Sequence, residues 1–139
     1  MNKVFDNKKI FRVLDANFNR AKEGLRVCED ICRFMFDERG ATKEYKILRH
    51  ALTSAMTHVR WARLVGARDV GSDVGKGSSL TEFKRRDVED IFYANSQRVK
   101  ESLRVLEEFT KLAAPQVTEK VKRLRYQAYI VERKVTQRF

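Results

Sequence analysis

Asparagine, arginine and glutamate recur at the same spacing in two places of the chain, as Asn17, Arg20 and Glu23 and as Asn95, Arg98 and Glu101. At about 100° per residue, the asparagine and arginine of each set fall inside the apolar arc of a helix. The glutamate lies at its edge, where it can hold the guanidinium by an ion pair. Burying an amide and a guanidinium is costly unless both are hydrogen-bonded, and an arginine fork can hold two phosphate oxygens at once. We therefore predict a site for an anion and a heterocycle at the centre of a helical bundle; the alternative is a polar network that only fixes helix register.

The two sets belong to an internal repeat. Residues 16–31 align without a gap on residues 94–109 and are identical at nine of 16 positions, and a weaker echo relates 42–50 to 118–126. The pattern predicts two related helices whose identical side chains face each other across a pseudo-twofold axis. Gly24 and Ser102, one turn beyond the arginines, are small enough to leave room for a ligand between the helices. Arg49 and Arg125 can add positive charge to this cleft, although a surface position is the open alternative for either.

Apolar residues recur every three or four positions, which is typical of helices, and no sustained alternation indicates a strand. We predict helices over about 9–36, 42–65, 82–115 and 117–139. Gly40 would cap the first, Thr42 would start the second, and a capping box at 79–82 would open the third. The fold class is therefore all-α, with two repeated helical hairpins forming a four-helix-type bundle. One domain spans 1–139, with repeat one at about 9–65, a glycine-rich crossover loop at 66–81 and repeat two at about 82–139.

The crossover loop holds four of the six glycines together with basic and acidic residues. Backbone amides in such a segment can cradle phosphates, and aspartates can hold hydrated Mg²⁺. The spacing does not match a P-loop. The candidates for nucleotide contact are Arg68, Gly71, Gly75 and Lys76, and those for the metal are Asp69 and Asp73. A linker without a binding role is the alternative.

The formal net charge of +11 predicts a surface that attracts anions, whether nucleic acid, acidic membrane or phosphorylated small molecules. No apolar run approaches the roughly 20 residues of a membrane helix, and the start lacks a secretory signal, so we expect a cytoplasmic protein without a membrane partner. Cys28 and Cys32 share a helix face with apolar residues and are expected to be reduced core residues. His50 and His58 match no catalytic arrangement.

Several blocks carry a family resemblance. They are Asp15-Ala16-Asn17, Asn19-Arg20-Ala21, Glu23-Gly24-Leu25-Arg26-Val27, Leu48-Arg49-His50, Arg68-Asp69, Asp73-Val74-Gly75 and Glu101-Ser102-Leu103-Arg104-Val105. The chain resembles the small monofunctional hydroxymethylpyrimidine-phosphate kinases, which occur alone or fused to the N-terminus of thiamin-phosphate synthase. The resemblance implies that ATP phosphorylates 4-amino-5-hydroxymethyl-2-methylpyrimidine phosphate to the diphosphate in thiamin biosynthesis, with Mg²⁺ as cofactor.

On this hypothesis Arg20 and Arg98 bind the phosphates, and Asp69 with Asp73 holds magnesium. The candidates for the pyrimidine are Asp15, Asn17, Asn95 and one of Glu23 and Glu101, with Arg49 adding charge. The resemblance leaves open which half binds the nucleotide and whether a homo-oligomer completes the cleft, and it implies a functional link to thiamin-phosphate synthase.

Two alternatives remain: a basic helical module that binds nucleic acid, and a noncatalytic helical partner of thiamin-phosphate synthase. The inward arginines, and aromatic residues that are not interleaved with surface basic residues, argue against nucleic acid.

Overall fold

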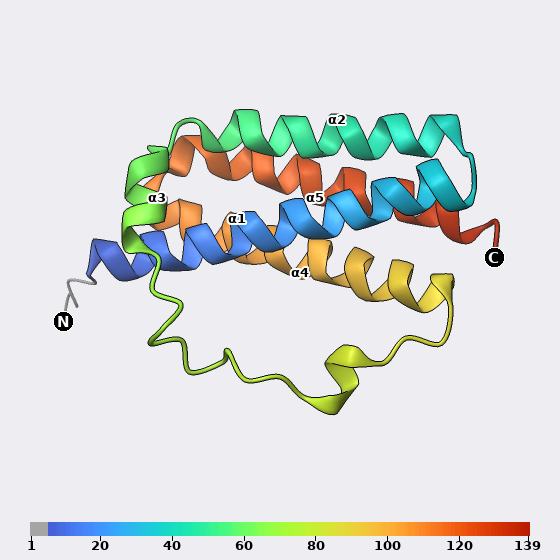
Figure 1. Ribbon diagram of the computed structural model, residues 1–139. Helices are drawn as coiled ribbons and strands as arrows, with labels where there is room; N and C mark the ends of the chain where they lie inside the picture. Colours follow the sequence, from blue (N-terminus) through green and yellow to red (C-terminus); the bar gives the residue numbers. More distant parts are fainter. Residues whose placement is uncertain (1–5) are drawn as a thin grey trace.

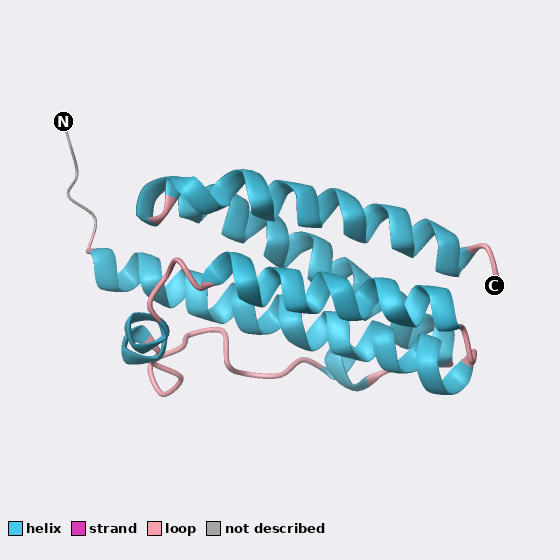
Figure 2. Cartoon of the chain, turned by 90° about the horizontal axis from the view of Figure 1, so that it is seen from above, coloured by secondary structure: helices cyan, strands magenta, loops and turns pink. Residues whose placement is uncertain are grey.

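Five α-helices and no strand make up residues 6–139, the part of the chain that the computed structural model describes. They are α1 (Asn7–Asp30), α2 (Arg39–Met56), α3 (Trp61–Ala67), α4 (Val88–Ala113) and α5 (Pro115–Thr136). A π-helical turn (Ile31–Met35) extends α1, and a 3₁₀ turn (Leu80–Phe83) precedes α4. The four long helices lie alongside one another, and α3 crosses them at one end (Figures 1 and 2). The all-α prediction is therefore confirmed.

Two antiparallel helical hairpins, α1–α2 and α4–α5, are joined by a segment without an α-helix, residues 68–87, which we call the crossover segment. It leaves α3 at one end of the bundle and runs along the outside of α1 and α4 to the other end (Figure 1). Because α1 and α4 also pack directly against each other, the crossover segment lies beside the helix pair that carries the repeated motif.

The helix boundaries differ from the sequence expectation at the turn between α1 and α2. Gly40 does not cap α1, because the chain reverses at Asp37, which has a φ of 48°, and α2 has already begun at Arg39. The side chain of Glu38 caps α2 by accepting a hydrogen bond from the Gly40 amide at 3.2 Å. Thr42 lies one turn inside the helix, where its hydroxyl donates to the Glu38 carbonyl. The first helix thus ends without the expected glycine cap, and Glu38 rather than Thr42 caps the start of α2.

The second hairpin also begins later than expected. The capping box at 79–82 yields only the 3₁₀ turn, and α4 starts at Val88, where the Asp87 side chain accepts from the Asp90 amide at 2.9 Å. The predicted helix end near Pro115 is confirmed, because this proline begins α5 at a position where its missing N–H costs no helical hydrogen bond.

A helix break that the sequence did not predict separates α2 from α3. The periodicity indicates one helix to about residue 65, yet α2 ends at Met56 and the chain turns before Trp61. The turn buries Val59 and Leu64. No glycine or proline marks this position in the sequence, and burial of these two side chains favours the turn over a continued helix.

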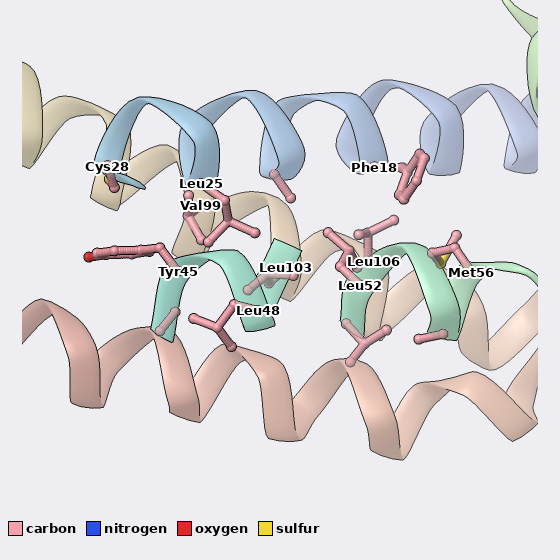
Figure 3. Close-up of a cluster of buried hydrophobic side chains, with 14 of the residues drawn as sticks. Phe18, Leu25, Cys28, Tyr45, Leu48, Leu52, Met56, Val99, Leu103 and Leu106 are labelled. Carbon is pink, nitrogen blue, oxygen red and sulfur yellow. The ribbon is translucent and has the colours of Figure 1, made fainter. Parts of the chain in front are cut away.

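Leucine, valine and aromatic side chains from all four long helices fill the centre of the bundle (Figure 3). Cys28 and Cys32 lie in this core as free thiols, which confirms their prediction as core residues. Burial disfavours the thiolate and raises the pKa of Cys28 to about 12. The thiol is therefore protonated and unreactive at neutral pH. No helix among the described residues is long and apolar enough to span a bilayer.

Helices α1 and α4 pack closely at Gly24. A Cβ added there would lie 2.7 Å from Val99 Cγ2 and 3.0 Å from the Asn95 carbonyl oxygen. The small residue therefore serves helix packing, and the expected ligand space beside it is filled by Val99.

Replacing Gly24 with alanine should lower the free energy of unfolding by about 1–3 kcal/mol in urea titrations, because overpacking outweighs the gain of about 1 kcal/mol in helix propensity. Gly66→Ala is the matched control, since no atom lies within 4 Å of its added Cβ. A Gly24→Ala protein as stable as the Gly66→Ala protein would contradict the tight α1–α4 contact.

Candidate functional site

A cleft of about 900 Å³ opens between α1 and the start of the crossover segment. Helix α1 contributes cationic and polar side chains, the crossover segment contributes residues 68–70 and 72–74, and α4 contributes only Val105. The polar and charged lining residues are Lys9, Arg12, Asp15, Asn17, Asn19, Arg20, Glu23, Arg68, Asp69, Ser72 and Asp73. This list includes seven of the residues predicted from the sequence.

The buried carboxylate of Asp15 fastens the crossover segment to α1. Its two oxygens accept from Nε and Nη2 of Arg68, each at 2.8 Å, and the Asp15 side chain is only 4% exposed. This pairing raises the pKa of Arg68 above its ordinary value. Arg12 adds a second tie by donating to the Asp69 carbonyl at 2.9 Å. Asp15 and Arg68 therefore position the wall of the cleft, which differs from the separate ligand contacts expected for them.

Arg20 lies in the cleft but not inside the bundle, so the expectation of a buried guanidinium is wrong. Asn17 is buried, and its amide donates to the Val13 carbonyl at 2.9 Å. Arg20 is exposed and reaches the Asn17 oxygen at 3.5 Å. The long arginine stem carries its charge out to water from beside the buried Asn17. Among the described residues no ion pair joins Arg20 to Glu23.

The second set does not complete the cleft. Asn95 repeats the backbone bond of Asn17 by donating to the Ile91 carbonyl at 2.8 Å, and Arg98 is exposed like Arg20. However, Asn95, Arg98 and Glu101 are absent from the lining of the cleft. The expectation of one central pocket with paired side chains is therefore corrected to an outer cleft served mainly by α1.

Arg49 also lies outside the cleft. It donates to the buried Glu29 from Nε at 3.2 Å and from Nη2 at 3.4 Å, and Glu29 also binds Arg26 at 2.9 Å. Its charge is used within the α1–α2 hairpin.

The crossover segment lines the cleft with the carboxylates of Asp69 and Asp73, and not with the glycine amides that were expected to bind phosphate. Asp69 accepts from the Ser72 amide at 3.1 Å, and Asp73 accepts from the Gly75 amide at 2.8 Å. The first of these bonds lowers the pKa of Asp69. Lys76 donates to the Gly71 carbonyl at 3.0 Å, and Gly71, Gly75 and Lys76 do not line the cleft. The amide of Gly75 is thus already engaged by an aspartate.

Two carboxylates that line one cleft suit hydrated Mg²⁺, which keeps several waters and is bound through one or two carboxylates plus substrate phosphates. No group of three or more potential metal ligands from histidine, cysteine, aspartate and glutamate occurs in the described part of the chain. The donor set therefore fits a metal that arrives with phosphates better than a permanently held ion.

Sequence reasoning missed Lys9 and Arg12, which line the same cleft. Lys9 lies three residues before Arg12, and Arg12 lies eight residues, or about two helical turns, before Arg20. This spacing places all three on one face of α1. That spacing is the signal in the sequence, and both Lys9 and Arg12 lie before the repeated block.

Comparisons with known proteins show the family of the chain. The model of the ThiD2 family matches residues 12–134. Thiamine-phosphate synthase of Rhodopirellula baltica is 38% identical over 133 residues, which cover 94% of this chain and 35% of that protein. Thiamine-phosphate synthase of Synechocystis is 45% identical over 128 residues, covering 88% and 35%, respectively. The chain thus spans about a third of the length of these curated relatives. No solved structure matches it.

Proposed function

Because this chain belongs to the ThiD2 family, we propose that it is a phosphotransferase of thiamin biosynthesis that converts 4-amino-5-hydroxymethyl-2-methylpyrimidine phosphate to the diphosphate at the expense of ATP. The observation that carries the proposal is the cleft on α1, where Lys9, Arg12 and Arg20 line one wall and Asp69 and Asp73 line the other. The thiamine-phosphate synthases that match the chain support the pathway, because their name links them to thiamin synthesis.

The reaction needs positioning more than proton transfer. An oxygen of the acceptor phosphate forms a bond to the γ-phosphorus of ATP, the bond between that phosphorus and the β,γ-bridging oxygen breaks, and ADP leaves with the electron pair. A phosphate monoester has a second pKa of about 6, so its attacking oxygen is mostly ionised at neutral pH and no general base is required. The main demand is to hold two polyanions in line while their repulsion is cancelled.

The residues of the cleft meet this demand in distinct ways. Arg20 is exposed and can bind phosphate oxygens bidentately, with Lys9 adding charge along the same wall. Asp69 and Asp73 would hold Mg²⁺, which supplies charge neutralisation of the nucleotide phosphates. Asp15, through Arg68, keeps the crossover segment against α1. Asn17 and Glu23 offer acceptors for the amino group of the pyrimidine.

The test is to incubate the purified protein with magnesium-ATP and either the phosphorylated or the free hydroxymethylpyrimidine, and to follow both the diphosphate and ADP. We expect the diphosphate from the phosphorylated compound, and none when magnesium is chelated. Absence of product with every combination at high protein concentration would contradict the proposed kinase activity.

A second function is favoured by the length of the relatives. Since the chain spans about a third of each thiamine-phosphate synthase, it could act as a noncatalytic helical partner of that enzyme. Failure of the kinase assay together with a rise in synthase activity on mixing the two proteins would support this function. Binding to nucleic acid has no comparable support, and a filter-binding titration with steep salt dependence would be needed to establish it.

We also propose that the two hairpins arose by duplication. The ion pair of Glu29 with Arg49 has a counterpart in Glu107 with Arg125, whose Nε donates at 2.8 Å, at the offsets of 78 and 76 residues that relate the sequence repeats. The Asn17 and Asn95 backbone bonds match in the same way. Matched contacts in both hairpins support a common ancestor for them.

A further inference from the structure

A second hollow, of about 450 Å³, lies beside the cleft where α3 crosses the bundle. It exists because α2 ends at Met56 and the chain turns into α3, so that Trp61 stands opposite α1. Its floor is apolar and is made by Phe18, Met56, Val59 and Leu64. Figure 3 shows Phe18 on α1 and Met56 on α2 at this end of the core. None of these side chains is needed for the cleft described above.

Trp61 is the unusual residue of this hollow. Phe18 is 4% exposed, whereas Trp61 is 60% exposed and meets Phe18 edge to face, with ring centroids 6.4 Å apart and planes at 77°. Most of the Trp61 ring surface is therefore in contact with water. A flat ring that stacks on it would bury this apolar surface, which is favourable. The hollow therefore offers an aromatic platform that the fold alone does not cover.

Polar groups at the rim connect the hollow to the cleft. Asn19 and Glu23 line both, so a ligand with its ring in the hollow can reach the cleft without leaving the protein surface. Lys22 also lines the hollow, with Nζ 5.4 Å from the centre of the Phe18 ring. No ion pair of Lys22 or Glu23 occurs within the described part of the chain. The Glu23 carboxylate can therefore accept a hydrogen bond from an amino group of a ligand, and the Lys22 ammonium can bind a phosphate of that ligand.

The hydroxyl groups of two threonines that line the hollow, Thr53 and Thr57, offer acceptors rather than donors. Thr53 donates to the Arg49 carbonyl at 3.2 Å and Thr57 donates to the Ser54 carbonyl at 2.6 Å, so the hydroxyl hydrogens are used and the oxygens can still accept. Together with Glu23 and the Asn19 oxygen, they favour a ligand that brings N–H donors on its ring edge.

From these features we infer that the hollow beside Trp61 is a subsite for a planar, amino-substituted nitrogen heterocycle, whose phosphate extends over Asn19 and Glu23 into the cleft. The inference rests on the proposed function for the identity of the ligand, which is either the pyrimidine of the acceptor or the adenine of the nucleotide. Both bring the same chemistry, a flat ring with an exocyclic amine and a phosphate.

Trp61 is the single tryptophan of the chain, so its emission reports directly on the subsite. The intact protein is titrated in separate experiments with hydroxymethylpyrimidine phosphate, with AMP and with inorganic phosphate, without any turnover. We expect a saturable change in tryptophan emission with one of the two heterocycles and none with inorganic phosphate; the effective compound identifies which ring occupies the hollow. If neither heterocycle changes the emission, or if inorganic phosphate changes it equally, the inference is overturned.

Variants supply a second readout by calorimetric titration of the heterocycle that changes the emission. Trp61→Ala should weaken its binding about fivefold or more, since stacking of a base on an aromatic side chain is typically worth at least that factor. Trp61→Phe should restore most of the affinity. Ile130→Ala on α5, which also removes a large exposed apolar side chain, should bind as the original protein does. Equal affinity of the Trp61→Ala and Ile130→Ala proteins would overturn the subsite.

These outcomes separate the subsite from the proposed reaction. Saturable binding that depends on Trp61 without formation of the diphosphate would keep the subsite and remove the kinase function. Product formation with unchanged substrate KM values in Trp61→Ala would keep the kinase function and remove the subsite.

Discussion

Replacing Arg20 with alanine should lower kcat/KM for hydroxymethylpyrimidine phosphate by about two to three orders of magnitude, the loss typical when a hydrogen-bond donor to the charge of a transition state is removed. Arg20 is exposed in the cleft, and its contact within the protein is a long hydrogen bond of 3.5 Å to Asn17. The free energy of unfolding should therefore change by less than about 0.5 kcal/mol. Steady-state kinetics and urea unfolding of the same preparation measure both quantities.

Three further variants show whether the effect depends on position and on the guanidinium fork. Arg20→Lys should retain part of the activity, because an ammonium keeps the charge but not bidentate binding. Arg98→Ala should lose less than Arg20→Ala, because Arg98 does not line the cleft. Arg133→Ala, an exposed change on α5, should leave the rate unchanged. Near-normal turnover in Arg20→Ala would remove this arginine from the mechanism.

The sequence predicted the helices well where packing follows a regular period. The apolar positions of α1 and α4 recur every three or four residues and are buried as expected, among them Leu14, Leu25 and Leu103. Helix ends were predicted less well, because they depend on local alternatives. Glu38 caps α2 where Thr42 had been expected to start the helix. The turn before α3 buries Val59 and Leu64, and no glycine or proline marks it in the sequence.

The site was predicted in composition more than in geometry. Asn17, Arg20 and Glu23 do line a cleft with Asp69 and Asp73, since spacing along one helix fixes which side chains share a face. A helical wheel cannot say whether that face meets the core or the groove outside a helix pair, and the exposed Arg20 shows the difference. The sequence also could not show that Asp15 would bind Arg68, because 53 residues separate them.

The largest expected effect on stability comes from the buried ion pair between α4 and α5. The Arg125 side chain is 11% exposed, and its Nε donates to Glu107, whose side chain is 7% exposed, at 2.8 Å. This bond raises the pKa of Arg125 above its ordinary value. Arg125→Met should lower the free energy of unfolding by about 3 kcal/mol in urea titrations, because a buried carboxylate is left without its main partner.

The double variant Arg125→Met with Glu107→Leu tests this reason, because it removes the stranded charge and should recover most of the loss. Arg123→Met on the same helix is the matched control. Arg123 is 74% exposed and lies 3.6 Å from Glu119, so its loss should cost less than about 0.5 kcal/mol. Equal stability of the Arg125→Met and Arg123→Met proteins would show that the pair contributes nothing.

Arg49→Met, in the other hairpin, should cost less than Arg125→Met. Glu29 keeps a second close partner, Arg26 at 2.9 Å, whereas the corresponding contact of Glu107 with Arg104 is 3.8 Å long. The carboxylate of Glu29 thus remains paired after the substitution, and that of Glu107 is left with a distant, exposed guanidinium. The two decreases in the free energy of unfolding are measured under the same conditions. Their difference gives the contribution that a second close arginine makes to stabilising a buried carboxylate. A larger loss in Arg49→Met would contradict this assignment of partners.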